Sequence, residues 1–332
     1  MQCNTTGSSN ASLANIINLN NLYTPFGSFA TVTNILCVLV VLSKKHMREK
    51  YGAFGVLSFG DMLNALAMVL SGSIRNQQIN DNSFVSLSTF DCFRNPWPHL
   101  FIVGGQLPAF VLIVMAGERV IAVFKPIFYR TYVTPRIRLI ANIICVVLSI
   151  LSLLIGILFS YLNREVCTNP ACSTIGSTGR LYGTFNYILI VPLPCVALVL
   201  NILAYVGAKR LSVSTNMERE LKKVLVSLVI ASLAVLLSAL PNIMIWGQGI
   251  FWNIPGLGYM YIGFCCNSAV DLFAFFFLKE DFRNRLLSLI SHGYINRRFN
   301  LHEVTETNAK RNMLHGIPNK PPLRSTIVEA LH

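Results

Sequence analysis

Two carboxyl groups stand inside long apolar stretches of this sequence. Asp61 is the only charged residue between positions 52 and 74, and Asp271 is the only one between 224 and 278. Placing an ionisable side chain in such surroundings costs several kcal/mol of free energy, so each acid is a candidate functional residue. If the two carboxyl groups approach each other, either a proton or a cation must lie between them.

Three uncharged polar residues are placed where they can join these acids. Asn267 and Asp271 are four positions apart, which puts them on one face of a helix, and Asn34 and Ser268 fall at compatible depths in their own apolar runs. One interpretation is a buried cluster that holds water or a monovalent cation and rearranges when the helices move. The alternative is that Asn and Ser only hydrogen-bond one helix to another.

A second chemical pattern is the dipeptide Glu118-Arg119, followed by Pro126 and Tyr129. An acid beside an Arg at a helix end can restrain the guanidinium through an ion pair and release it on protonation or movement. The released Arg can then donate hydrogen bonds to the carbonyls of a partner. The competing interpretation is an interfacial charge pair that extends to lipid headgroups. The position of the dipeptide, and the Pro and Tyr after it, favour the first.

Four further prolines interrupt apolar runs. Pro241 removes a backbone hydrogen bond in the middle of one run, which predicts a hinge there. Pro192 and Pro194 predict a break in the run before it, and Pro108 predicts a kink that is as well explained by packing alone. After the last run, the segment 279–290 places four apolar residues on one helix face: Phe282, Leu286, Leu289 and Ile290. This pattern predicts an amphipathic helix that lies along the membrane interface.

All these residues must be positioned by helices that cross a lipid bilayer. Of the 332 residues, 53% are hydrophobic and 12% are charged, whereas soluble proteins carry roughly 25% charged residues. Seven apolar runs approach or exceed the roughly 20 residues that a membrane helix needs. They cover 26–42, 52–74, 99–124, 139–162, 181–208, 224–246 and 256–278. The sequence therefore predicts an all-α membrane protein, a seven-transmembrane helix bundle.

The distribution of basic residues predicts the orientation of the bundle. With the N-terminus outside, the outer segments hold only Arg75, Arg94, Arg164 and Arg180, and the other 23 of the 27 Lys and Arg lie on the inner side. The Lys and Arg residues that give the net charge of +13 therefore flank membrane spans, and this charge does not indicate nucleic-acid binding. We expect an extracellular segment at 1–23 glycosylated at the sequons of Asn4 and Asn10, one receptor domain at 24–290, and a disordered cytoplasmic tail at 291–332.

Taken together, the motifs resemble those of rhodopsin-like (class A) G-protein-coupled receptors over residues 24–290. The chain is most similar to nematode chemosensory serpentine receptors of the Srsx or Srx type, in its short third inner loop and the stretch G-E-R-V-I-A-V-F-K-P-I-F-Y. The matching positions are Asn34 in span one, Leu57 to Asp61 in span two, Glu118-Arg119-Val120 with Pro126 and Tyr129 after span three, Pro241 in span six and Asn267 to Phe275 in span seven.

The chain also departs from the family pattern at several positions. Leu272 replaces the proline of span seven, Phe275 replaces its tyrosine, and span six lacks the usual tryptophan. Pro108 stands near the place of a serine that helps to hold sodium in relatives. These departures weaken the expectation of a sodium ion at Asp61 and of the standard toggle between states.

The resemblance implies a disulfide from Cys92, just before span three, to the second outer loop. Either Cys172 or Cys167 is available as the partner, and Cys172 is preferred. The resemblance also implies a ligand pocket that opens to the outside among spans three, five, six and seven. The candidate lining residues are Phe101, Gly105, Gln106, Asn242, Trp246, Tyr261 and Cys265.

By the same resemblance, the protein would be a receptor in the plasma membrane, in a sensory neuron or its cilium, with no cofactor. It would bind a small, mostly apolar odorant or metabolite, or a short peptide, and activate a heterotrimeric G protein. Phe101 stands where amine receptors keep an Asp, so a cationic amine lacks its counter-ion. No catalytic or metal-ligand spacing indicates an enzyme. The alternatives are a small ion-coupled transporter or channel that uses Asp61 and Asp271, and a receptor remnant that no longer signals.

Overall fold

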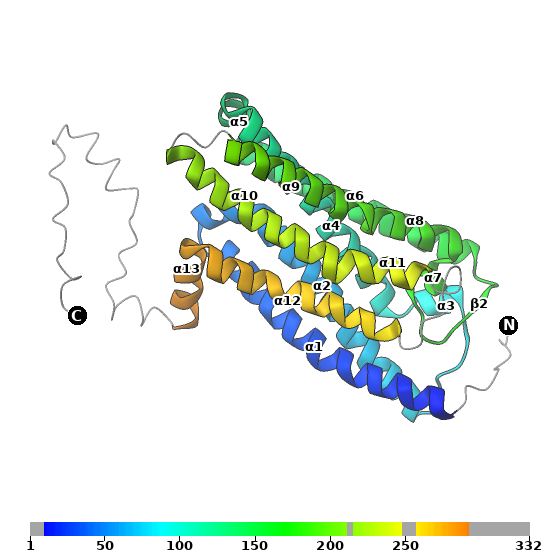
Figure 1. Ribbon diagram of the computed structural model, residues 1–332. Coiled ribbons are helices and arrows are strands. Elements are labelled where there is room, and N and C mark those ends of the chain that lie inside the picture. Colours follow the sequence, from blue (N-terminus) through cyan, green and yellow to red (C-terminus); the bar gives the residue numbers. More distant parts are fainter. Residues whose placement is uncertain (1–9, 211–214, 248–256, 292–332) are drawn as a thin grey trace, which may run out of the picture. The chain divides into compact units, whose positions relative to one another are not determined.

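The seven predicted spans are present as helices. The computed structural model describes residues 10–210, 215–247 and 257–291, and seven helical segments in these ranges are long and apolar enough to cross a membrane. In order they are α1 (Asn10–Leu42), α2 (Lys45–Asn80), α4 (Pro96–Phe124), α6 (Pro135–Leu162), α8 and α9 (Arg180–Ile190 and Pro192–Arg210), α10 and α11 (Thr215–Ala234 and Leu240–Gly247), and α12 (Tyr261–Leu278) (Figure 1). The predicted fold class is confirmed.

Short elements connect or extend these helices. They are β1 (Leu87–Ser88) and β2 (Cys167–Thr168), which pair antiparallel, with α3 (Thr89–Phe93), α5 (Pro126–Tyr132), α7 (Thr174–Thr178) and α13 (Glu280–Ile290). A π-helical turn, Val235–Ala239, joins α10 to α11, and a 3₁₀ turn, Leu257–Met260, precedes α12. The chain divides into two compact units, the first ending at Arg283, and the contacts between residues described below lie within that first unit.

The helix α6 shows most clearly that the bundle is built for lipid. Its large aliphatic residues are turned outward, and Leu154, for example, is 54% exposed. Water would penalise such a surface by roughly 25 cal/mol for each Å² of apolar area, whereas lipid does not. The buried face of α6 instead carries small or polar residues, which let it approach its neighbours closely: Asn142, Cys145, Ser149, Ser152, Gly156 and Ser160.

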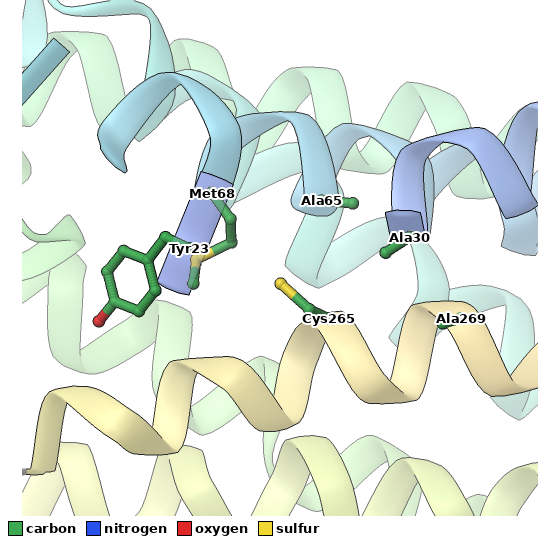
Figure 2. Close-up of a cluster of buried hydrophobic side chains, with 6 residues drawn as sticks. All are labelled: Tyr23, Ala30, Ala65, Met68, Cys265 and Ala269. Atoms are coloured by element: carbon green, nitrogen blue, oxygen red, sulfur yellow. The ribbon is translucent and has the colours of Figure 1, made fainter. Parts of the chain in front are cut away.

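The first helix begins earlier than the first apolar run. α1 starts at Asn10, within the segment predicted to lie outside the receptor domain, and Tyr23 is only 3% exposed. Its hydroxyl donates to the carbonyl oxygen of Gly258 at 2.7 Å. Figure 2 shows Tyr23 in a cluster formed by α1, α2 and α12 that also contains Ala30, Ala65, Met68, Cys265 and Ala269. The helix begins before the apolar run because residues there, such as Tyr23, pack against other helices.

Two of the predicted helix interruptions are present, and each coincides with a proline. α8 ends at Ile190 and α9 starts at Pro192, where a missing backbone N–H is tolerated at the first position of a helix. Pro241 follows the π-helical turn Val235–Ala239, a local widening of the kind that accommodates a proline ring. Gly263 of α12 faces this point, since a Cβ added there would lie 2.8 Å from the carbonyl oxygen of Leu237.

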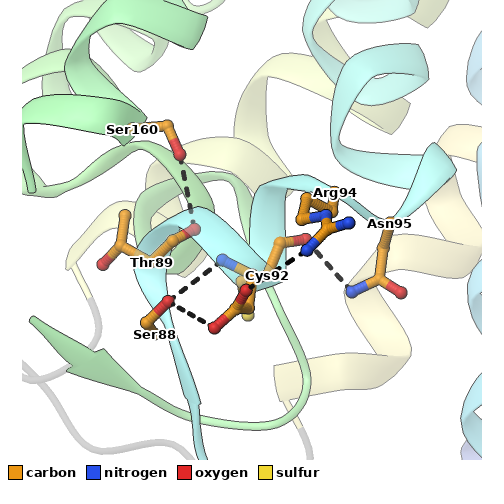
Figure 3. Close-up of polar contacts among 7 residues, drawn as sticks. Ser88, Thr89, Cys92, Arg94, Asn95 and Ser160 are labelled. Carbon is orange, nitrogen blue, oxygen red and sulfur yellow. Dashed lines mark hydrogen bonds and ion pairs between the residues drawn. The ribbon is translucent and has the colours of Figure 1, made fainter. Parts of the chain in front are cut away.

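At one end of the bundle, which we call the disulfide end, Cys92 is joined to Cys172. Cys167, the other candidate, is also disulfide-bonded. The short helix α3 holds Cys92 in place through local hydrogen bonds (Figure 3): Ser88 Oγ accepts from the backbone N–H of Asp91 at 3.1 Å, and Asn95 Nδ2 donates to the carbonyl oxygen of Cys92 at 3.1 Å. The loop between α6 and α8 is thereby attached to the start of α4.

Candidate functional site

The opposite end, which carries α5 (Figure 1), contains a cavity of about 980 Å³. We call it the basic cavity because its lining includes seven Lys or Arg residues and four acids. The basic residues are Lys45, Arg48, Lys50, Arg119, Arg136, Arg138 and Lys279, and the acids are Glu49, Glu118, Glu280 and Asp281. Its volume exceeds that of a single bound water by more than an order of magnitude, so it has room for part of another macromolecule.

The sequence predicted that Glu118 forms an ion pair with Arg119, but Glu118 pairs with Arg138 instead. Its Oε1 lies 2.7 Å from Nε of Arg138 in α6 and accepts a hydrogen bond from Tyr129 at 2.9 Å. Among the described residues, no ion pair joins it to Arg119. The expected pairing is therefore not the one the structure has, because successive helical residues point in different directions while Arg138 faces Glu118 across the two helices.

Arg119 itself lines the basic cavity, and its Nε is enclosed without a hydrogen-bond partner. An enclosed guanidinium N–H without an acceptor is costly. An incoming carbonyl or carboxylate group would satisfy it. This is the chemistry that the sequence assigned to Arg119, reached without a contact to the acid beside it.

Tyr129 links the two charged residues of this network. Its hydroxyl donates to Glu118 and accepts from Nη2 of Arg138 at 2.6 Å. Burial and the Glu118 carboxylate raise the pKa of Tyr129, so the phenol keeps its proton and remains a donor near neutral pH. Pro126 begins α5, the short helix that carries Tyr129. Pro126 and Tyr129 of the sequence pattern thus help to form a network that joins Glu118 of α4 to Arg138 of α6.

Aromatic residues pack together where the start of α2 meets the end of α12. Phe54 stacks on Phe275 with ring centroids 3.5 Å apart, and Tyr51 meets both Phe275 and Phe282 edge to face. Lys50 forms an ion pair with Asp281. Sequence reasoning missed Tyr51 and Phe54. Their signal was available, since aromatic residues one turn apart at a helix start commonly anchor packing.

The intramembrane polar residues meet as a group, with one exception. The side-chain carboxyl groups of Asp61 and Asp271 lie close enough to interact directly, so a proton or a cation must lie between them. Nδ2 of Asn34 donates to the carbonyl oxygen of Ser268 at 2.9 Å, and Oγ of Ser268 donates to that of Asp61 at 3.4 Å. In the described part of the chain no hydrogen bond connects Asn267 to this group.

Three enclosed oxygen atoms near the cluster have no partner: Oδ2 of Asp61, Oδ1 of Asn34 and Oγ of Ser58. They are the kind of donor set that water or a monovalent cation would satisfy. Pro108 limits the space available, because a Cβ added at Gly60 would lie only 2.6 Å from its Cδ. The residue that replaces a sodium-holding serine is therefore a packing contact to α2. No group of three His, Cys, Asp or Glu suited to a metal occurs in the part of the chain that is described.

A small cavity of about 40 Å³ lies on the other side of the polar group. We call it the amide cavity because Asn64, Asn186 and Asn242 line it. Four residues predicted for the ligand pocket also line it: Phe101, Gly105, Asn242 and Tyr261. Gln106 is adjacent, and its Nε2 donates to Asn186 at 2.7 Å. Trp246 and Cys265 are not among the lining residues.

The remaining lining residues were not predicted: Asn64, Thr174, Asn186, Tyr187, Ile190, Ser238 and Phe264. Asn64 and Asn186 carried a signal, because each is a polar residue within an apolar run. No Asp, Glu, Lys, Arg or His lines the amide cavity. The cavity therefore suits an uncharged group that exchanges hydrogen bonds with amides and hydroxyls.

Of the two predicted glycosylation sites, Asn10 is the first residue of α1, and Asn4 lies outside the described residues.

The comparison with known families agrees with these motifs. A family model described as the serpentine type 7TM GPCR chemoreceptor Srsx matches residues 28–290. No curated protein matches the chain. The matched stretch contains the polar group, the amide cavity, Glu118-Arg119 and all of α13.

Proposed function

The chain belongs to the Srsx family of serpentine seven-transmembrane chemoreceptors, and from this premise we propose that it activates a heterotrimeric G protein when a small molecule binds at the disulfide end. The protein is a receptor with several membrane spans. Its basic end faces the cytoplasm in this proposal, since that is where the excess of Lys and Arg lies. The plasma membrane is the compartment in which such a receptor meets external chemicals.

The observation that carries the proposal is Arg119 in the basic cavity. Its Nε is enclosed without an acceptor, and the acid next to it is held by Arg138 at 2.7 Å. A helix entering the cavity with its C-terminal end would present unpaired carbonyl groups and a negative dipole end to this guanidinium. The basic lining would attract such a helix end and would also favour acidic side chains on it.

Ligand binding would act on this cavity by shifting the population between two packings of the bundle. The hinge at Pro241 lies at the amide cavity, which Ser238 and Asn242 on either side of it line, and Ile230 of the same span lines the basic cavity. A ligand that needs more room than the 40 Å³ of the amide cavity must displace its walls. Movement of α11 about the π-helical turn would carry that displacement to α10.

The alternative of an ion-coupled transporter or channel is not favoured by the family match. Such a protein would use Asp61 and Asp271 as steps in an ion path. The two carboxyl groups instead interact with each other, and the Pro108 ring packs directly on Gly60 beside them.

The test is a screen of small neutral and charged metabolites on cells that express the chain with a G-protein readout. We expect at least one compound to raise the signal and Arg119→Ala to abolish it at unchanged surface expression. Arg130→Ala is the matched control, since Arg130 is exposed on α5 outside the cavity lining. An unchanged signal in surface-expressed Arg119→Ala refutes the role of Arg119. Ligand-evoked currents that persist when G-protein signalling is blocked would support the transporter instead.

A further inference from the structure

Arg75, at the disulfide end, forms no ion pair with any carboxylate of the described residues. Arg75 lies near the end of α2, and its Nη2 donates to the carbonyl oxygen of Ala171, next to the disulfide. Its guanidinium also lies 5.4 Å from the ring centroid of Trp97. Its Nε is enclosed and has no hydrogen-bond partner. A carbonyl oxygen and an aromatic face stabilise the cation only in part, and its charge stays uncompensated.

Within the described part of the disulfide end, no carboxylate lies in a position to pair with Arg75. The segments at the disulfide end contain three acids, Asp81, Asp91 and Glu165, and all three are exposed. The nearest basic residue to Asp91 is Arg94, whose Nη1 lies 3.9 Å from it. Residues 1–9 and 248–256, which lie outside the described part, contain no Asp or Glu in their sequence. Any full counter-charge for Arg75 must therefore come from another molecule.

The other basic residues of this end differ from Arg75. Arg94 approaches Asp91, and Arg164 donates from Nη1 to the hydroxyl of Tyr161 at 2.9 Å while its guanidinium lies over the same ring. Arg180 is exposed to solvent. Arg75 alone in this set combines enclosure of a guanidinium N–H with the absence of an acceptor for it.

Phe101 and Tyr261 connect the surroundings of Arg75 to the amide cavity. Tyr261 lies within electrostatic reach of Arg75 and also lines the cavity. Phe101 lines the cavity too and packs against the cluster that contains Trp97. The rings of Phe101 and Tyr261 are 6.2 Å apart. A ligand whose uncharged body occupies the amide cavity therefore reaches Arg75 by displacing one or both of these rings.

We propose that the ligand of this receptor is a small organic acid whose carboxylate pairs with Arg75 while its neutral body fills the amide cavity. This rests on the proposed function and defines the ligand class for it. A planar guanidinium with free N–H groups recognises a carboxylate better than a Lys ammonium does. Amines are excluded, because Arg75 repels them.

The experiment uses two readouts on the full-length receptor. The first is the thermal stability of the purified protein with matched sets of acids, the corresponding primary amides and the corresponding amines, each built on the same short skeletons. The second is G-protein signalling in cells with the same compounds. We expect acids to raise the melting temperature and the signal, and the amide of an active acid to be at least ~10-fold weaker, as loss of a charge-assisted hydrogen bond implies.

Three variants separate the charge of Arg75 from its structural contacts. Arg75→Gln is expected to raise the acid concentration needed for half-maximal stabilisation by ~10-fold or more, with a smaller effect for Arg75→Lys, which keeps the charge. Arg164→Gln removes an aromatic-stacked Arg from the same end and should leave the response unchanged. Arg75→Lys also covers the case in which Arg75→Gln does not fold.

Each outcome decides between the two proposals. Stabilisation by amides or amines and by no acid overturns the organic-acid ligand and leaves the receptor function standing. An acid response that survives unchanged in folded Arg75→Gln overturns the role of Arg75. Acid stabilisation that depends on Arg75 but produces no signal supports the site and refutes G-protein coupling. A receptor stabilised by nothing in the panel refutes the acid ligand.

Discussion

Arg138 of α6 holds Glu118 of α4 at 2.7 Å, across the two helices. Glu118 is thus committed to a neighbouring helix, and Arg119, the next residue, is left to face the basic cavity. The pair is partly enclosed, with side-chain exposures of 31% for Arg138 and 15% for Glu118, so it is screened less than a surface ion pair.

We therefore predict that Arg138→Ala lowers ligand-independent signalling several-fold. Without Arg138, the Glu118 carboxylate loses its ion-pair partner. It can then form an ion pair with Arg119, the next residue in the chain, and hold that guanidinium away from the G protein. The measurement is basal G-protein activity normalised to surface expression. Arg130→Ala, which removes an exposed Arg of α5 that does not line the basic cavity, is the control. Basal activity that is equal in the two variants contradicts the prediction, and the swap Glu118→Arg with Arg138→Glu should restore part of the loss.

The disulfide gives a prediction about non-additivity. Cys92→Ser and Cys172→Ser should each destabilise the receptor by about 2–4 kcal/mol, since the bond closes a long loop. The double variant should be no less stable than either single one, because the same bond is lost in all three. Cys195→Ser, at a free cysteine, is the control. The check is the melting temperature of purified protein, and additive losses would show that the two cysteines do not pair.

The contact between α2 and α4 at Gly60 predicts a steric effect. Gly60→Ala should destabilise the bundle by about 1–3 kcal/mol, because the new Cβ would lie 2.6 Å from Cδ of Pro108. Adding Pro108→Ala to it should recover part of that loss by removing the ring. Gly117→Ala is the control on α4, since nothing lies within 4 Å of its Cβ position. A melting temperature of Gly60→Ala no lower than that of Gly117→Ala would contradict the close packing.

The close approach of the Asp61 and Asp271 carboxyl groups predicts unequal effects of two substitutions, if the two groups share a proton. Asp271→Asn should keep the melting temperature near that of the native chain, because an amide donates the hydrogen bond that a protonated carboxyl donates. Asp271→Ala should lower it, since Asp61 then loses its partner in an apolar setting. Both are measured in sodium chloride and in choline chloride. A sodium-dependent stability that Asp271→Asn abolishes would show that a cation, and not a shared proton, joins the two groups.

How far the site was predictable depends on the distance over which each residue acts. The hinge at Pro241 and the break before Pro192 follow from the chemistry of one residue, the missing backbone N–H, and needed no knowledge of neighbours. The resemblance to known receptors, and not the chemistry of single residues, placed Phe101, Gly105, Asn242 and Tyr261 at the ligand pocket. Their counterparts Asn64 and Asn186 were not, because which face of a helix looks inward depends on how the other helices pack.

The sequence by itself determined that seven helices cross lipid, because the length and apolarity of a span are local properties set by the thickness of a bilayer. It also determined where the costly polar residues are. Only the tertiary structure decided their partners: Arg138 for Glu118, Cys172 for Cys92, and no acid for Arg75. Partners depend on rotation and register between helices far apart in the chain, and small, nearly degenerate packing differences set these.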